Sequence, residues 1–145
     1  MQETVPRSML RKNAKIELLK RVPLFAGCSK RELGEIAAVA DELDLPASRD
    51  LTREGASGRE FLILVDGEAD VLRGGRLVAG LGPGDFLGEV ALLTGGPRTA
   101  TVRTRGAARV LVLTASGFRT LMREVPSIQA KVLMALAARV APDYD

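Results

Sequence analysis

The chain has 145 residues, a length typical of one domain, with 46% apolar residues, 27% charged residues and a formal net charge of +3. It holds no histidine and one cysteine, Cys28, which excludes a Ser/His/Asp triad, a Cys/His pair, a zinc site and an internal disulfide. We therefore expect a protein that is not an enzyme, holds no metal and, because no apolar run could span a bilayer, is cytoplasmic.

The first part of the chain is basic and is predicted to be helical. Residues 1–21 hold six basic and two acidic residues, whereas the remainder is close to neutral. Such a segment can touch a partner, an anionic membrane or nucleic acid, or can be a solvated face. The spacing predicts a helix over about Asn13 to Arg21. Ser29 and Glu32 then form a capping box that opens a second helix. Its apolar face consists of Leu33, Ile36, Ala37 and Ala40.

Short apolar runs separated by glycines extend from about Leu43 to Leu113. Brief strands with turn signals this frequent are typical of an antiparallel sandwich, roll or barrel. The clearest strands are Phe61 to Val65, Leu77 to Ala79, Thr99 to Arg103 and Val110 to Leu113. We therefore predict an all-β block between two groups of helices.

The pattern after this block is helical again. Ser116 is a plausible N-cap for a short helix that runs to about Arg123. Pro126 suits the first turn of a final helix, because the missing proline N–H would have no partner there in any case. The apolar stripe of this helix consists of Ile128, Val132, Leu136 and Val140.

The most informative segment is 84–102, which combines glycine turns with one predicted short helix, Glu89 to Leu93. Gly88 allows a ligand to approach the backbone closely. The N–H groups of Val90 and Ala91 would then point out of a helix N-terminus, which favours an anion.

Arg98 and Glu89 carry the chemistry of this segment. A guanidinium with backbone N–H groups matches the single negative charge of a cyclic phosphate. A glutamate would repel a phosphate but accepts a hydrogen bond well from a ribose 2′-hydroxyl. The two residues therefore suit a ribose 3′,5′-cyclic phosphate, although they could instead pair as a surface salt bridge.

The same segment resembles a known family. Its residues Gly-Glu-x-Ala-Leu-Leu (88–93) and Pro-Arg-Thr-Ala-Thr-Val (97–102) look like the phosphate-binding cassette of cyclic nucleotide-binding domains. These domains occur in the catabolite activator protein, in regulatory subunits of cyclic-nucleotide-dependent kinases and in cyclic-nucleotide-gated channels. Residues 22–25 and 61–71 resemble the entry segment and the central hairpin of that family.

The resemblance implies a fold and a domain division. The fold class would be mainly β with flanking α: an eight-stranded antiparallel β-roll, or jelly roll, with a short cassette helix. The chain would form a single domain, 1–145. Its parts would be N-terminal helices (1–42), the β-roll (43–114, with the cassette at 84–102) and two C-terminal helices (115–141).

The resemblance also implies site residues. Glu89 would bind the ribose 2′-hydroxyl and Arg98 the cyclic phosphate. Backbone groups and neighbours of the phosphate would come from Gly88, Val90, Ala91, Thr99 and Ala100. Val78 and Leu72 are candidates for the wall around the base. Arg139 is at a place comparable to that of a lid arginine in a bacterial channel's binding domain, and it could equally be a surface arginine.

The function implied is a non-catalytic sensor of cyclic nucleotide whose C-terminal helix transmits occupancy. The alternative is a scaffold or dimerisation module that keeps the fold without ligand. No cofactor is expected, and we favour cAMP over cGMP, although Thr99 permits either base. The last helix could cover the base as a lid, or it could be part of the core. It could also be the surface through which the chain forms a homodimer or binds a partner domain. No DNA binding and no membrane span are expected, because no recognition-helix unit and no long apolar run are present.

Overall fold

The computed structural model describes residues 7–88, 92 and 95–140, with side chains from residue 13 to 134 in those ranges and that of Ala137. Eight strands and four helices of ten residues or more lie in this part of the chain. In chain order the elements are α1 (Arg7–Lys20), the 3-10 turn η1 (Pro23–Phe25), α2 (Lys30–Val39), β1 (Ala40–Leu45), β2 (Asp50–Thr52), β3 (Glu60–Asp66), β4 (Ala69–Arg73), β5 (Arg76–Leu81), β6 (Phe86–Leu87), β7 (Thr101–Thr104), β8 (Ala108–Thr114), α4 (Ala115–Glu124) and α5 (Pro126–Val140).

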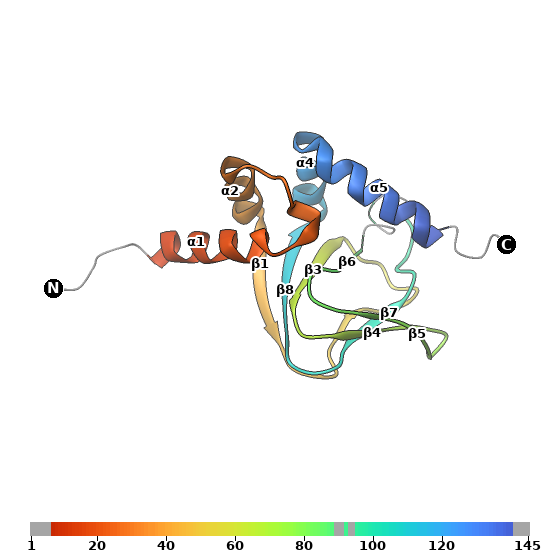
Figure 1. Cartoon of the computed structure of the whole chain (residues 1–145). Helices are drawn as coiled ribbons and strands as arrows, with labels where there is room; N and C mark the ends of the chain where they lie inside the picture. Colours follow the sequence, from red (N-terminus) through yellow and green to blue (C-terminus); the bar gives the residue numbers. More distant parts are fainter. Residues whose placement is uncertain (1–6, 89–91, 93–94, 141–145) are drawn as a thin grey trace.

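The strands form two four-stranded sheets, which face each other as a roll (Figure 1). The first sheet has the order β1-β8-β3-β6 and the second the order β2-β7-β4-β5. Every strand pair is antiparallel. The predicted fold class, an eight-stranded antiparallel roll flanked by helices, is confirmed.

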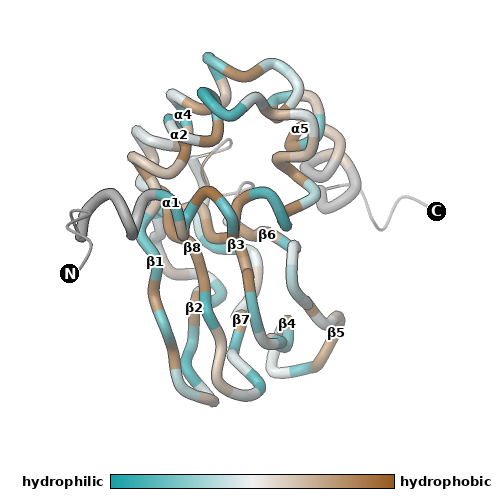
Figure 2. Tube along the Cα trace, turned by 60° about the vertical axis from the view of Figure 1, so that its left-hand side comes forward, coloured by the Kyte–Doolittle hydropathy of each residue, from teal (hydrophilic) through white to brown (hydrophobic). Residues whose placement is uncertain are grey.

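Strand β3 is apolar on both faces, which explains its unbroken run Phe61–Val65. Phe61, Ile63 and Val65 pack with the helices in one buried cluster. Leu62 and Leu64 alternate with them and pack in a second cluster, between the two sheets. The helices gather at one end of the roll (Figure 2). Among the described helices, none has the length and apolar character needed to cross a bilayer.

Of the four predicted helix starts, those of α2 and α5 are confirmed and those of α1 and α4 are wrong. The Ser29–Glu32 capping box is present, with both reciprocal hydrogen bonds, and α5 begins at Pro126. Helix α4, however, begins at Ala115, and its N-cap is Thr114 rather than Ser116. The Thr114 hydroxyl accepts a hydrogen bond from the Gly117 N–H at 3.1 Å.

The boundary between the N-terminal helices and the roll also differs from the prediction. Helix α1 begins at Arg7, six residues earlier than expected. Ala40, predicted to lie on a helix face, is the first residue of β1 and pairs with Leu113 of β8. The first strand therefore begins before residue 43, because pairing with a distant strand overrides the local helical pattern.

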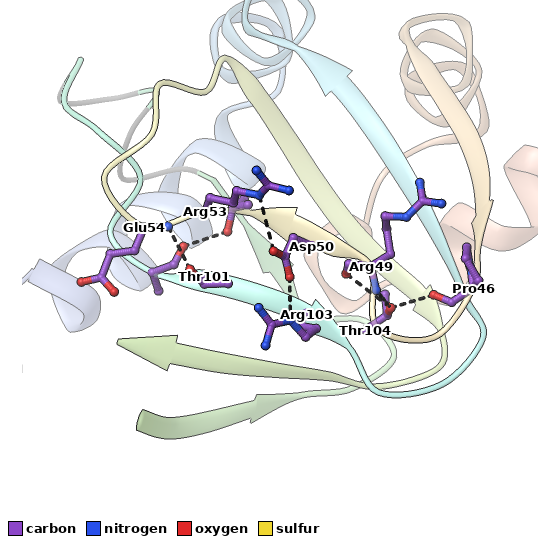
Figure 3. Close-up of polar contacts among 10 residues, drawn as sticks. Pro46, Arg49, Asp50, Arg53, Glu54, Thr101, Arg103 and Thr104 are labelled. Carbon is purple, nitrogen blue, oxygen red and sulfur yellow. Dashed lines mark hydrogen bonds and ion pairs between the residues drawn. The ribbon is translucent and has the colours of Figure 1, made fainter. Parts of the chain in front are cut away.

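Thr104, at the end of β7, ties the loop before β2 to the second sheet (Figure 3). Its side chain is 2% exposed. The hydroxyl accepts a hydrogen bond from the Arg49 N–H at 2.8 Å and donates to the Pro46 carbonyl at 2.7 Å. One hydroxyl therefore satisfies two backbone groups from the turn between β1 and β2.

We expect Thr104→Val to lower the free energy of unfolding by about 1–3 kcal/mol, because the isosteric side chain leaves both backbone groups without this partner. Thr104→Ser is the control, since it keeps the hydroxyl and should lose less. Urea unfolding followed by circular dichroism measures both. Equal stability of the valine and serine variants would contradict the role of the hydroxyl.

Candidate functional site

Arg98 is a buried arginine in the segment that leads to β7. Arg98 is 6% exposed. The Gly55 N–H donates to the Arg98 carbonyl at 2.8 Å, and the Arg98 N–H donates to the Ala56 carbonyl at 2.9 Å. This two-bond exchange with the loop that leads to β3 fixes the backbone from which the guanidinium extends.

The guanidinium is held close to the start of β3. Nη2 of Arg98 donates to the Glu60 carbonyl at 3.0 Å. A Cβ placed on Gly58 would overlap the guanidinium, so glycine is required there for this side-chain position. Nothing in local sequence links Gly58 to Arg98, and the sequence analysis did not identify it.

Gly88 also lies close to the same guanidinium. It follows β6 and has φ +100, a conformation that favours glycine. A Cβ there would lie 2.5 Å from the Glu60 carbonyl oxygen and 2.8 Å from Nη1 of Arg98. The Leu92 N–H donates to the Gly88 carbonyl at 3.2 Å. The structure thus brings together Arg98 and Gly88, which the sequence analysis predicted to share a site.

Several predicted site residues lie outside the described residues. These are Glu89, Val90 and Ala91, with the side chain of Arg139 in α5. Of the predicted helix Glu89 to Leu93, only Leu92 is described, and it is helical.

The two residues after Arg98 lead into β7. Thr99 is exposed, and Ala100 is buried. The Thr52 hydroxyl donates to the Ala100 carbonyl at 2.9 Å, and the Glu54 N–H donates to Oγ1 of Thr101 at 3.0 Å. These bonds attach the chain that follows Arg98 to β2 and its following loop.

The candidates for the base wall lie on the hairpin of β4 and β5. Val71 pairs with Val102 and packs with the cluster between the sheets, so alternation puts Leu72 on the opposite face. Val78 is the extra residue of a register shift, since Val71 pairs with Ala79 and Leu72 with Leu77. Val71 therefore faces the cluster between the sheets, on the side of β4 opposite to Leu72. The alternation of Ala69 with Val71 was a signal that could have found it.

Helix α5 is attached to η1 by one side chain. Nζ of Lys131 donates to the carbonyls of Pro23, Leu24 and Ala26 at 3.1, 3.3 and 3.1 Å. Ile128 and Val132 lie one turn apart on α5, and both are buried in the cluster that the helices share with the first sheet. The 3-10 turn η1 also lies close to the segment before β6. A Cβ on Gly84, in that segment, would lie 2.8 Å from Cδ of Pro23. Thus η1 contacts both α5 and the segment that leads to Gly88.

We expect Lys131→Met to loosen α5 without unfolding the roll, because it keeps the aliphatic stem and removes three charge-assisted hydrogen bonds. Hydrogen exchange of the α5 amides, measured by mass spectrometry, should accelerate about three- to tenfold, equivalent to about 1 kcal/mol. The control is Arg123→Met, which removes an exposed cation from α4. Unchanged exchange in α5 would show that the apolar contacts alone hold the helix.

Cys28 and Asp50 have shifted pKa values. Burial raises the pKa of the Cys28 thiol, which favours the less nucleophilic protonated form. On the outer face of the second sheet, a hydrogen bond from Arg103 lowers the pKa of Asp50. Among the described residues, no three His, Cys, Asp or Glu side chains gather as a candidate metal site.

Comparison with known proteins gives a consistent result. The family model "Cyclic nucleotide-binding domain" matches residues 42–125. A cAMP-dependent protein kinase regulatory subunit of Emericella nidulans is 34% identical over 115 residues, which cover 78% of this chain and 28% of the relative.

Solved structures agree with that match. The regulatory domain of Toxoplasma gondii PKA in complex with cAMP has a TM-score of 0.76 and 27% identity, covering 94% of this chain and 51% of that one. The catabolite activator protein of Thermus thermophilus has a TM-score of 0.71 and 28% identity, covering 83% and 59%. The chain thus spans between a quarter and three fifths of these relatives.

Proposed function

Because this chain belongs to the cyclic nucleotide-binding domain family, we propose that it is a regulatory module that binds a cyclic nucleotide through Arg98. The observation that carries the proposal is the fixed, buried guanidinium beside Gly88. A planar guanidinium binds two phosphate oxygens at once, and burial strengthens that attraction. Its hydrogen bond to the Glu60 carbonyl holds it in place before the ligand arrives.

The other site residues take their roles around this anchor. Glu89 would accept a hydrogen bond from the ribose 2′-hydroxyl, and the N–H groups of Val90 and Ala91 would face the phosphate. Thr99 is exposed, so its hydroxyl can donate to a phosphate oxygen or accept from a base amine.

For the wall around the base we propose Val71 in place of Leu72, with Val78 kept as a candidate. Val71 is supported by its interior face, and Val78 by its 53% exposure at the bulge of β5. Arg139 stays a candidate lid residue, because it belongs to α5, which passes over the end of the roll where β6 lies (Figure 1).

We favour cAMP as the ligand. The kinase regulatory subunits among the relatives carry cAMP in their names, and the Toxoplasma gondii structure contains it. Occupancy would act by differential affinity for two positions of α5, since a ligand shifts a conformational equilibrium only by that difference. The attachment of α5 to η1, which touches the approach to Gly88, supports α5 as the output element.

Calorimetric titration of the chain with cAMP, cGMP and 5′-AMP tests the proposal. We expect saturable binding of both cyclic nucleotides, tighter for cAMP, and much weaker binding of 5′-AMP, whose extra charge and open phosphate do not match one guanidinium. Tighter cGMP binding would reassign the ligand. Absence of binding to both cyclic nucleotides would make the chain a ligand-free scaffold.

A further inference from the structure

The hairpin of β4 and β5 ends in two arginines that face each other. Gly74 and Gly75 form its two-residue turn, with φ of +58 and +77. Both central residues with positive φ fit the type I′ turn that favours tight hairpins. The register then pairs Arg73 directly with Arg76. We refer to Arg73 and Arg76 as the tip arginines.

This pairing is unfavourable for the isolated hairpin. Residues directly opposite each other have Cβ atoms about 4.5–5.5 Å apart, and like charges at that distance destabilise the sheet. Within the part of the chain that the structure describes, neither tip arginine forms an ion pair.

The other arginines of this sheet have acidic partners. Arg103 pairs with Asp50 at 2.7 Å, and Arg105 pairs with Asp70 at 2.7 Å (the former drawn in Figure 3). Carboxylates are therefore available on this sheet and are used by its other arginines. The tip arginines lie at the end of a hairpin that extends from the roll (Figure 1).

We propose that the β4–β5 hairpin is a docking site for an acidic segment of a partner protein, whose carboxylates bind the tip arginines. Two neighbouring guanidiniums suit two carboxylates of one segment. Leu77, next to Arg76, is 63% exposed and supplies an apolar contact. Because β5 is the last strand of its sheet, a partner can also approach from the side.

The surroundings favour a protein segment over a nucleic acid or an anionic membrane. A phosphate backbone needs an extended basic stripe. Here acidic groups flank the tip instead: Oε1 of Glu54 accepts from the Gly74 N–H at 2.9 Å, and Asp70 lies three residues before Arg73 on β4. A compact positive tip between carboxylates, with an exposed leucine beside it, matches a short acidic and apolar peptide.

The test uses Arg73→Glu, which replaces the repulsive pair by an attractive one. The probe is a fluorescein-labelled twelve-residue peptide that alternates Asp-Glu with Phe, and the competitors are its Asn-Gln counterpart, a single-stranded oligonucleotide and vesicles with 30% phosphatidylserine. The control is Arg49→Glu. Arg49 is also exposed, lies just before β2, and undergoes the same charge change.

We expect Arg73→Glu to weaken peptide binding by about tenfold or more and to raise the Tm by about 1–3 °C. Arg49→Glu should do neither. In the parent, backbone amide shifts caused by the peptide should map to residues 73–78. Both variants should bind cAMP as the parent does, which separates this proposal from that of the nucleotide site.

Three results would overturn the docking site. One is equal peptide affinity of Arg73→Glu and the parent. Another is a shift map centred elsewhere. The third is stronger binding of the oligonucleotide or the vesicles than of the peptide, with loss of that binding in Arg73→Glu, which would assign the tip to a different class of partner.

Discussion

Arg98→Ala should nearly abolish cyclic nucleotide binding. Arg98 is the one lysine or arginine in the cassette sequence 84–102, so its loss leaves the cyclic phosphate without an ionic partner in the cassette. Removing one member of a buried, hydrogen-bonded charge pair costs about 2–5 kcal/mol, which is roughly 30- to several-thousand-fold in affinity. Calorimetric titration with cAMP measures the loss, and circular dichroism confirms the fold.

Arg98→Lys is the matched variant for this experiment. It keeps the positive charge, but an ammonium cannot bind two oxygens in a plane or keep the same contact with the Glu60 carbonyl. It should therefore restore binding only in part. If Arg98→Ala binds cAMP within about threefold of the parent, the phosphate is bound elsewhere and the assignment of the cassette is wrong.

Gly88→Ala should disrupt the same site by a steric route. The added methyl would meet the Glu60 carbonyl oxygen at 2.5 Å and Nη1 of Arg98 at 2.8 Å, and the backbone at φ +100 already disfavours a side chain. The backbone conformation alone costs about 1–3 kcal/mol. Displacement of the guanidinium should add a loss of cAMP affinity of about tenfold or more.

Gly27→Ala separates the two effects. Gly27 has φ +90, close to that of Gly88, but a Cβ there meets no atom within 4 Å. Both variants should lower the Tm, whereas only Gly88→Ala should lower the affinity for cAMP. Thermal unfolding and calorimetric titration measure the two quantities. Equal affinities of the two variants would show that contact between Gly88 and Arg98 is unimportant for binding.

The elements that could be predicted are those with a strong local pattern. The Ser29 capping box satisfies its own backbone groups, and the run Phe61–Val65 is too apolar and too short for anything but a buried strand. The start of α4 depended on distant residues. Thr114 and Ser116 are both good N-caps, and Thr114 was selected because β8 pairs with β3 as far as Thr114, opposite Glu60.

The site residues that could be predicted were likewise those with a strong local pattern. Arg98 and Gly88 belong to one contiguous motif and could be identified from it. Gly58 precedes Arg98 by forty residues and becomes part of the site only when the loop before β3 crosses the cassette. Leu72 was chosen from its apolar character alone, whereas the pairing of Val71 with Val102 decides which side chain of β4 faces inward.

Three of the strand pairings are nested one inside another, and this has a consequence for how the chain folds. Arg73 pairs with Arg76 at the centre, Asp50 with Arg103 further out, and Ala40 with Leu113 at the periphery. Each outer pair closes a loop that the pair inside it has already shortened, so the entropic barrier to every step falls once the previous step is complete. The β4–β5 hairpin is the natural starting point, and its repulsive tip slows the first closure. Refolding should therefore take milliseconds to seconds, as is usual for roll topologies, and the edge strand β1 should be the last to join.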